Sequence, residues 1–141
     1  MFDQFDTNVI LENLHFLIEG MQLTLLLTIA AICGGLVLGT LLALARLSGF
    51  WILSLVSSTY VNFFRSMPLI LVIFWFYFLV PLILGQPVGG YYSVLIAFVL
   101  FEAAYYCEII RAGIQSVSKG QVYAGQAVGL NYFQNMFYIV L

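Results

Sequence analysis

Long apolar runs separated by a few charged residues dominate the pattern along this chain. Glu19 and Arg46 bracket an uncharged stretch of 26 residues, 20–45. About 20 predominantly apolar residues are enough for a helix to cross the hydrocarbon core of a membrane. The pattern therefore predicts a first membrane span over residues 21–45.

The next long uncharged stretch, between Arg65 and Glu102, is interrupted in its middle by residues that favour turns. The interrupting residues are Pro81, Gly85, Pro87, Gly89 and Gly90. This pattern predicts a second span over residues 68–84 and a third over residues 92–110, with Glu102 near the centre of the third.

Small residues recur every four positions in the first predicted span, a spacing that places them on one ridge of a helix. They are Ala31, Gly35, Gly39 and Ala43. A ridge of this kind, which here includes a Gly-xxx-Gly pair, lets another helix pack closely in lipid. The sequence predicts such a contact without identifying the partner helix.

Residues 47–64 are also uncharged, but they are the most polar of the candidate spans. If they lie on the surface, the basic residues Arg46, Arg65, Arg111 and Lys119 share one side of the membrane, and the acidic residues Asp3, Asp6, Glu12 and Glu19 share the other. If they cross, the basic residues split two and two. The positive-inside rule favours the surface placement. We therefore expect an interfacial helix at 47–64, cytoplasmic segments at 46–67 and 111–130, and an external N-terminus.

Both ends of the chain contain further apolar positions. The stretch Asn8 to Ile18 predicts a short amphipathic helix on the outer face, with Val9, Ile10, Leu14, Phe16 and Leu17 available to the membrane interface. Residues 133–141 turn apolar again and predict the start of a fourth span. We expect residues 1–141 to form a single transmembrane domain whose chain continues past Leu141.

Composition supports a membrane protein. The chain has 64% hydrophobic and 7% charged residues, and its mean hydropathy is +1.10. An ordinary soluble domain carries about 25% charged residues. Four basic residues argue against nucleic-acid binding, which needs a basic face. Cys33 and Cys107 lie in apolar stretches, so we expect small core residues there and no disulfide or metal site. The predicted class is an all-α membrane protein.

No catalytic constellation appears in the sequence. The single histidine, His15, falls in the outer-face segment, and the single lysine, Lys119, follows no Gly-rich loop. The chain therefore has no phosphate-binding P-loop and is not expected to be an enzyme that hydrolyses ATP alone. Glu102 and Glu108 stand six residues apart, too far along a helix for a shared acid–base role.

A helix-turn-helix is predicted after the third span. A short helix over residues 119–128 would end at Gly129, where a left-handed backbone permits a sharp turn, and a second helix would follow. Either an ordinary connecting loop or a docking surface for a cytoplasmic motor fits these residues.

This segment resembles the EAA loop of permeases in ABC importers, whose pattern is Glu-Ala-Ala, three residues, Gly, nine residues, then Ile-x-Leu-Pro. The corresponding positions here are Tyr123, Ala124, Gly125, Gly129, Ile139 and Leu141. The chain departs from the pattern at Tyr123, where Glu is usual, and at Gly125, where Ala is usual. The Glu varies in the amino-acid branch, so the first departure does not remove the resemblance.

Two other stretches are similar to the polar amino-acid branch of this family. Residues 60–69 resemble the stretch that precedes the second span, and residues 101–116 resemble the corresponding stretch of permeases for glutamate and aspartate. The resemblance runs from Leu14 to Leu141.

The resemblance implies a permease subunit of a bacterial inner-membrane importer for a polar, acidic amino acid. Its expected partners are a second permease subunit, ATPase subunits that bind ATP and Mg, and a periplasmic binding protein, with no cofactor in this chain. The residues implied in ATPase docking are Gly120, Tyr123, Ala124, Gly125 and Gly129. Glu102 and Arg65 remain candidates for a role in the transport path or in structure.

Glu102 also supports a different class of function. A carboxylate in a membrane span is costly and often marks an ion or proton site, as in a gradient-driven secondary transporter or channel. A structural role is favoured here, with the hydroxyls of Thr24, Thr28 and Thr40, or a residue of a further span, as partners. A non-transporting membrane scaffold is the third reading, and the residues alone leave all three open.

Overall fold

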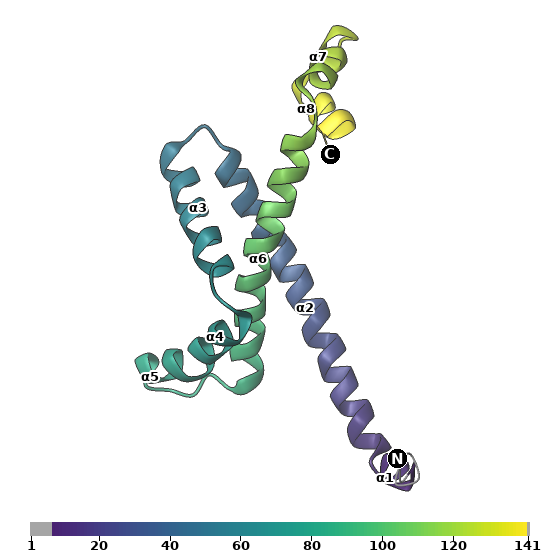
Figure 1. Ribbon diagram of the computed structural model, residues 1–141, viewed down its shortest axis with the longest axis vertical. Coiled ribbons are helices and arrows are strands. Elements are labelled where there is room, and N and C mark those ends of the chain that lie inside the picture. Colours follow the sequence, from purple (N-terminus) through teal and green to yellow (C-terminus); the bar gives the residue numbers. More distant parts are fainter. Residues whose placement is uncertain (1–6, 141) are drawn as a thin grey trace.

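The computed structural model describes the backbone of residues 7–140 and the side chains of residues 10–140. Within that range the chain is elongated and all-helical, built around two long helices, α2 (Leu14–Leu47) and α6 (Gly90–Ser116) (Figure 1). Both helices are long and apolar enough to cross a membrane. The all-α membrane class is therefore confirmed, with the first and third predicted spans lying inside α2 and α6.

The ridge of small residues in α2 packs against α6. All four ridge residues are buried: Ala31, Gly35, Gly39 and Ala43. At Gly39 the helices are so close that an added Cβ would lie 2.7 Å from the Cβ of Tyr106 and 2.9 Å from the carbonyl oxygen of Ala103. Gly34 faces Val99 while Gly39 faces Tyr106, so α2 and α6 run in the same direction. The partner helix that the sequence left open is α6.

Helix α3 (Trp51–Arg65) packs alongside both α2 and α6. Its buried residues are Ser57, Val61 and Phe64. The Tyr60 hydroxyl donates a hydrogen bond to the carbonyl oxygen of Leu100 in α6, at 2.8 Å. These contacts do not place α3 relative to a membrane, so the interfacial placement of residues 47–64 stays a prediction. The sequence reasoning weighed charges and polar residues and did not foresee that one face of α3 packs on the α2–α6 pair.

A sharp bend follows α3. The next helical stretch consists of α4 (Leu69–Phe74), the π-helical segment η1 (Trp75–Leu79) and α5 (Val80–Leu84), and it lies at 103° to α3. Pro68 at the bend has no N–H to donate and disfavours helical backbone in the residue before it. Counted as one broken span, α3 and this stretch bring the total to three. That span would begin at the start of α3 instead of at residue 68.

The turn before α6 is shorter than expected. Pro81 lies inside α5, directly after the π-helical segment, where the N–H of Val80 reaches back five residues to the carbonyl oxygen of Trp75. The turn itself lies between Gly85 and Gly89, which have φ values of 67° and 79°. Glycine adopts this left-handed backbone without steric cost.

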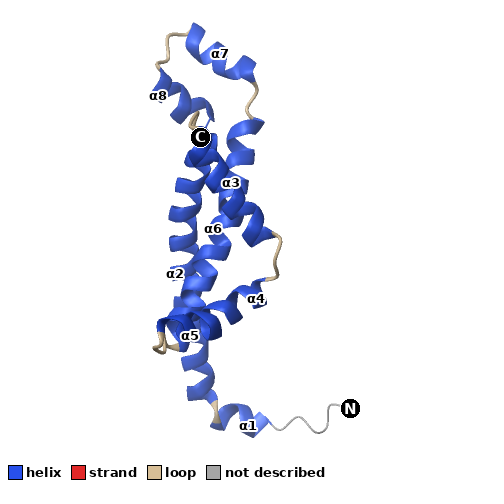
Figure 2. Cartoon of the chain, turned by 90° about the vertical axis from the view of Figure 1, so that its left-hand side faces the viewer, coloured by secondary structure: helices blue, strands red, loops and turns tan. Residues whose placement is uncertain are grey.

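The amphipathic helix expected over Asn8–Ile18 is divided in the structure. Helix α1 (Thr7–Glu12) ends before Asn13 and turns away from α2 (Figure 2), and residues 14–18 belong to α2. The expected apolar side chains within the described range are exposed: Ile10, Leu14, Phe16 and Leu17. The side chain of Val9, the acidic residues Asp3 and Asp6, and Leu141 lie outside the described residues.

Candidate functional site

A short helix, α7 (Lys119–Ala127), follows α6 and agrees closely with the helix predicted over residues 119–128. Ser118 begins it with a capping box. The Ser118 hydroxyl accepts from the backbone N–H of Gln121, and the Gln121 side chain accepts from the backbone N–H of Ser118. These bonds satisfy backbone donors that a helix start otherwise leaves free.

The break predicted at Gly129 is a left-handed turn, with φ of 89° at this residue. The backbone N–H of Leu130 donates to the carbonyl oxygen of Gly125 at 3.1 Å, and the N–H of Gly129 donates to that of Gln126 at 3.0 Å. These two bonds form the Schellman motif, which closes the end of α7.

The chain then turns into α8 (Tyr132–Asn135) and a second π-helical segment, η2 (Met136–Val140). Asn131 and Gln134 form another capping box at the start of α8, with both hydrogen bonds at 2.9 Å. The predicted second helix is confirmed, and it is fixed at its start in the same way as α7.

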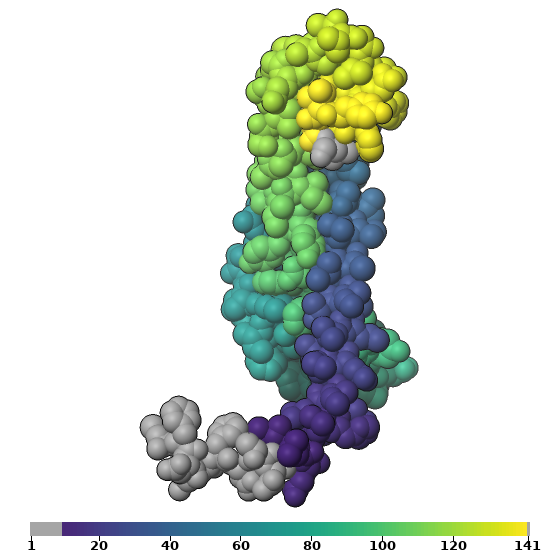
Figure 3. Space-filling view, turned by 90° about the vertical axis from the view of Figure 1, so that its right-hand side faces the viewer, coloured from purple at the N-terminus to yellow at the C-terminus, as the bar shows by residue number. Residues whose placement is uncertain are grey.

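One side chain joins the two helices across the turn. The amide nitrogen of Asn135 donates a hydrogen bond to the carbonyl oxygen of Val122 in α7, at 2.8 Å. Residues 118–140, which we call the EAA segment, therefore form a small body closed by its own hydrogen bonds. It stands as a compact head beyond the end of α6 (Figures 1 and 3).

The residues predicted to dock an ATPase fall into two groups. Gly120, Tyr123 and Ala124 are exposed on α7, and Tyr123 exposes 63% of its surface. Gly125 is buried against Asn135, and Gly129 forms the turn. A groove of about 460 Å³ lies between α7 and η2, beside Ala124. The first group can contact a partner directly, and so can the exposed Gly129, whereas the buried Gly125 can act only through the shape of the segment.

Three arginines meet one carboxylate in the helix bundle. Nη1 of Arg46 lies 2.6 Å from Oε2 of Glu108, and Nη1 of Arg65 lies 3.8 Å from the same oxygen. Arg111 donates to both carboxylate oxygens of Glu108. The Arg65 guanidinium also lies over the ring of Tyr105, 5.5 Å from its centroid. This cluster ties together α2, α3 and α6.

Sequence reasoning named Arg65 as a candidate but missed the cluster. The only local signal was the i,i+3 spacing of Glu108 and Arg111, which places them on one face of a helix. The contact between Arg46 and Glu108 joins residues 62 positions apart, and no sequence pattern predicts it.

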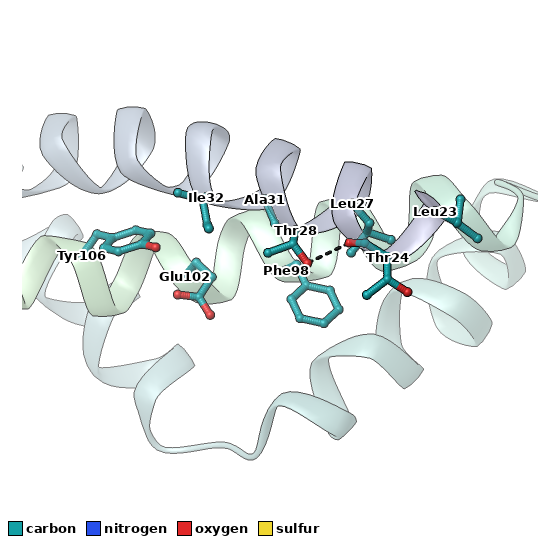
Figure 4. A pocket seen from close by; sticks show the side chains of 9 residues that line it. All are labelled: Leu23, Thr24, Leu27, Thr28, Ala31, Ile32, Phe98, Glu102 and Tyr106. Carbon is teal, nitrogen blue, oxygen red and sulfur yellow. Dashed lines mark hydrogen bonds between the residues drawn. The ribbon is translucent and has the colours of Figure 1, made fainter. Parts of the chain in front are cut away.

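Glu102 lines a groove of about 440 Å³ between α2 and α6 (Figure 4). The carboxylate makes no hydrogen bond or ion pair within the part of the chain that the structure describes. The expected partners Thr24, Thr28 and Thr40 donate instead to carbonyl oxygens of their own helix. Thr24 and Thr28 line the same groove, but their hydroxyl protons are already used.

Comparison with known proteins places this geometry in a family. The family described as "binding-protein-dependent transport system inner membrane component" matches residues 35–141. The glutamate/aspartate import permease protein GltK of Escherichia coli O157:H7 is 43% identical, over 98% of this chain and 65% of that protein. The glutamine transport system permease protein GlnP of Escherichia coli (strain K12) is 30% identical, over 98% of this chain and 64% of that protein.

A solved structure of similar fold is described as "Crystal structure of an amino acid ABC transporter with histidines". It superposes with a TM-score of 0.87 at 29% identity, over 98% of this chain and 64% of that one. The chain thus spans just under two thirds of the length of these relatives. The family match includes the last part of α2, residues 35–47, and everything from α3 to η2, and so contains the whole EAA segment. The chain belongs to the family of binding-protein-dependent transport system inner membrane components.

Proposed function

We propose that this chain forms the membrane-spanning core of a permease subunit in an ATP-driven importer of polar amino acids, with glutamate and aspartate as substrates. The observation that carries the proposal is the structure of the EAA segment. It is a helix-turn-helix closed by its own hydrogen bonds, with an exposed α7 face, at the end of two long apolar helices. The 43% identity to a glutamate/aspartate permease supports the substrate class.

In this proposal the exposed face of α7, with Tyr123 and Ala124, docks an ATPase subunit. The other partners are a second permease subunit and a periplasmic binding protein, and nucleic acid plays no part. ATP and Mg bind to the ATPase subunits, so this chain carries no cofactor and no ATPase site. Closure of the motors would move the EAA segment and rotate the α2–α6 pair, the rigid-body movement of alternating access.

The charges support an orientation with the N-terminus outside a bacterial inner membrane. Arg46, Arg65 and Arg111 gather around Glu108 at one end of the bundle, next to the EAA segment with its Lys119. Glu12, at the end of α1, and Glu19, near the start of α2, lie toward the other end. Basic residues concentrate on the cytoplasmic side of membrane proteins, so α7 would face the cytoplasm.

Cysteine labelling in intact cells tests this orientation. An impermeant maleimide should label Glu12→Cys from outside and should label Lys119→Cys only after the cells are opened. Labelling of Lys119→Cys from outside would reverse the orientation and remove the proposed docking face from the cytoplasm.

Docking is tested in the complete transporter that contains this chain. Ala124→Arg places a long charged side chain on the exposed face of α7 and should abolish co-purification of the ATPase and ATP-driven glutamate uptake. Gly49→Arg is the control, because an added Cβ at Gly49 meets nothing within 4 Å and the residue lies outside the EAA segment. Normal uptake and co-purification with Ala124→Arg would contradict the docking role.

Energy coupling is tested in proteoliposomes. Vesicles that contain the permease–ATPase complex should take up glutamate only when ATP is supplied to the ATPase subunits. This uptake should persist when ionophores dissipate the ion gradients. Uptake that follows an imposed gradient and ignores ATP would favour a secondary transporter instead.

A further inference from the structure

The amide of Asn135 occupies an unusual position inside the EAA segment. The residue is only 4% exposed. Its nitrogen donates to the carbonyl oxygen of Val122, which fixes the orientation of the amide. Its oxygen is buried and has no hydrogen-bond partner among the described residues. Nearly all buried polar atoms in folded proteins have a partner, so this oxygen calls for an explanation.

Gly125 supplies the space in which the amide lies. A Cβ built on Gly125 would lie 2.5 Å from Oδ1 of Asn135 and 3.1 Å from its Cγ, with Cγ1 of Ile139 at 3.3 Å. The backbone of Gly125 is ordinary α-helix, so glycine is not needed there for its conformation. It is needed because the amide of Asn135 occupies the volume that a Cβ methyl group on residue 125 would take.

This contact also explains where the chain departs from the EAA pattern. The pattern has Ala at the position of Gly125, and an Ala side chain could not coexist with Asn135 in its present place. The two residues are ten positions apart on opposite sides of the Gly129 turn. A change at either one therefore alters the fit between α7 and the helix that follows.

We infer that Gly125 and Asn135 form an interlocked pair that fixes the angle between α7 and α8, and that Asn135 is a positioning residue for the docking face of α7. The inference rests on the proposed docking function. The hydrogen bond to Val122 holds α8 against α7, and the missing side chain at Gly125 sets how closely the helices approach. Together they determine the direction in which Tyr123 and Ala124 face.

The burial of Oδ1 distinguishes this pair from a contact made by the partner. The oxygen has less than 1 Å² of exposed surface, so a docked subunit could not donate to it without opening the segment. The interlock is therefore internal to the EAA segment and should exist whether or not an ATPase is bound.

A double-mutant cycle in the complete transporter tests the pair. Gly125→Ala should lower ATP-driven uptake about ten-fold, because the methyl group overpacks the contact. Asn135→Ala should lower the amount of substrate moved per ATP, since α8 loses its hold on α7. ATP-driven uptake by the double variant should recover to within about two-fold of the uptake by Asn135→Ala, because the effects of substitutions at contacting residues are not additive. Gly113→Ala is the control, since Gly113 is also helical, lies in α6 outside the EAA segment, and an added Cβ there would meet nothing within 4 Å.

A second measurement does not depend on docking. Spin labels on Gln121→Cys and Tyr138→Cys report the spacing between α7 and η2, with Cys33 replaced by serine and the buried Cys107 left in place. Both labelled residues are exposed and line the same groove. The permease alone should give one narrow distance distribution, which Gly125→Ala shifts or broadens and the double variant restores.

The inference would be overturned if Gly125→Ala left both the spin-label distances and the uptake unchanged. It would also be overturned if uptake by the double variant were no higher than uptake by Gly125→Ala. If the distances behave as expected while no variant affects ATPase binding, the interlock exists but its role in docking is wrong. The proposed function fails separately if the parent transporter itself shows no ATP-dependent uptake.

Discussion

The α2–α6 pair and the EAA segment both depend on small residues, but for different physical reasons. In the pair, Gly35 and Gly39 remove side-chain volume so that two long helices approach closely. Packing of this kind suits lipid, where van der Waals contact must replace the hydrophobic effect between helices. In the EAA segment, Gly129 adopts the left-handed backbone of the turn, and Gly125 leaves room for the hydrogen-bonded amide of Asn135. Along its ridge the pair is joined by packing, with the Arg46–Glu108 ion pair near one end, whereas the two helices of the EAA segment are joined by a directional hydrogen bond.

This difference indicates where the molecule can move. Each region is internally fixed, and they meet at Val117 and Ser118, whose backbone is extended. A few residues at the end of an element can absorb the rotation between two rigid bodies. We expect movement at this link, with little change inside either region.

The largest effect is expected from Gly39→Leu. Even a Cβ at this position would lie 2.9 Å from the carbonyl oxygen of Ala103 and 3.1 Å from the backbone nitrogen of Cys107. Backbone atoms cannot move aside as a side chain can, so the variant should destabilise the helix pair by about 3 kcal/mol or more. Thermal unfolding of the detergent-purified protein measures this, together with the yield of folded protein from membranes.

Gly20→Leu is the matched control for this prediction. Gly20 lies in the same helix, and an added Cβ there would meet nothing within 4 Å. It should leave stability nearly unchanged. Equal stability of the two variants would mean that the close packing of α2 on α6 does not hold the fold together.

Gly129→Val should have the next largest effect, and it should act on coupling instead of insertion. At φ of 89° a side chain costs about 1–2 kcal/mol, which the short EAA segment cannot easily absorb. Uptake by the complete transporter should be abolished, while the amount of protein in the membrane stays normal. Gly113→Val is the control, because Gly113 lies in α6 with nothing within 4 Å of its Cβ position. Normal transport by Gly129→Val would contradict the role of this turn.

The sequence could predict the features of these two regions that depend on local spacing, but not those that depend on packing between distant helices. The ridge in α2 and the turn at Gly129 both follow from local spacing and from glycine's backbone freedom, and both predictions were confirmed. The packing of α3 on α2 and α6 was not predicted, because charge counting cannot detect that Ser57 is buried. Pro68 itself is a local signal for a bend, but the direction that the chain takes after it depends on what α4 packs against.

The candidate site could be predicted only in part for the same reason. The EAA pattern located the turn and the exposed face of α7, since both are properties of one short stretch. The burial of Gly125 under Asn135 depends on how the chain folds back across the turn. The meeting of Arg46 with Glu108 depends on the register between two long helices.

A smaller effect is expected from Glu108→Gln, which tests whether charge contributes where packing dominates. The amide keeps the shape of the carboxylate but leaves Arg46 and Arg111, which are mostly buried side chains, without their counter-charge. The variant should lose about 1 kcal/mol of stability, and the difference from the parent should shrink at high salt. Glu19→Gln is the control, because the Glu19–His15 pair is 61% and 89% exposed and exposed pairs contribute little. A loss as large as that of Gly39→Leu would show that the ion cluster, not the ridge, holds α2 to α6.

The smallest effect is expected from Glu102→Gln. The Cβ of Glu102 packs against Gly35, and the side chain lines the groove between α2 and α6, yet the carboxylate forms no hydrogen bond or ion pair with any described residue. An ionised carboxylate would repel an anionic amino acid, so direct binding of glutamate is not expected of it. Glutamine keeps the size and hydrogen-bonding capacity of the side chain, and assembly and glutamate uptake should stay within about two-fold of the parent, equivalent to roughly 0.4 kcal/mol. Competition of labelled glutamate uptake by glutamine and by arginine gives the decisive measurement. A changed order of preference among these amino acids would place Glu102 in the transport path, and the groove would then be part of the substrate route instead of a packing surface.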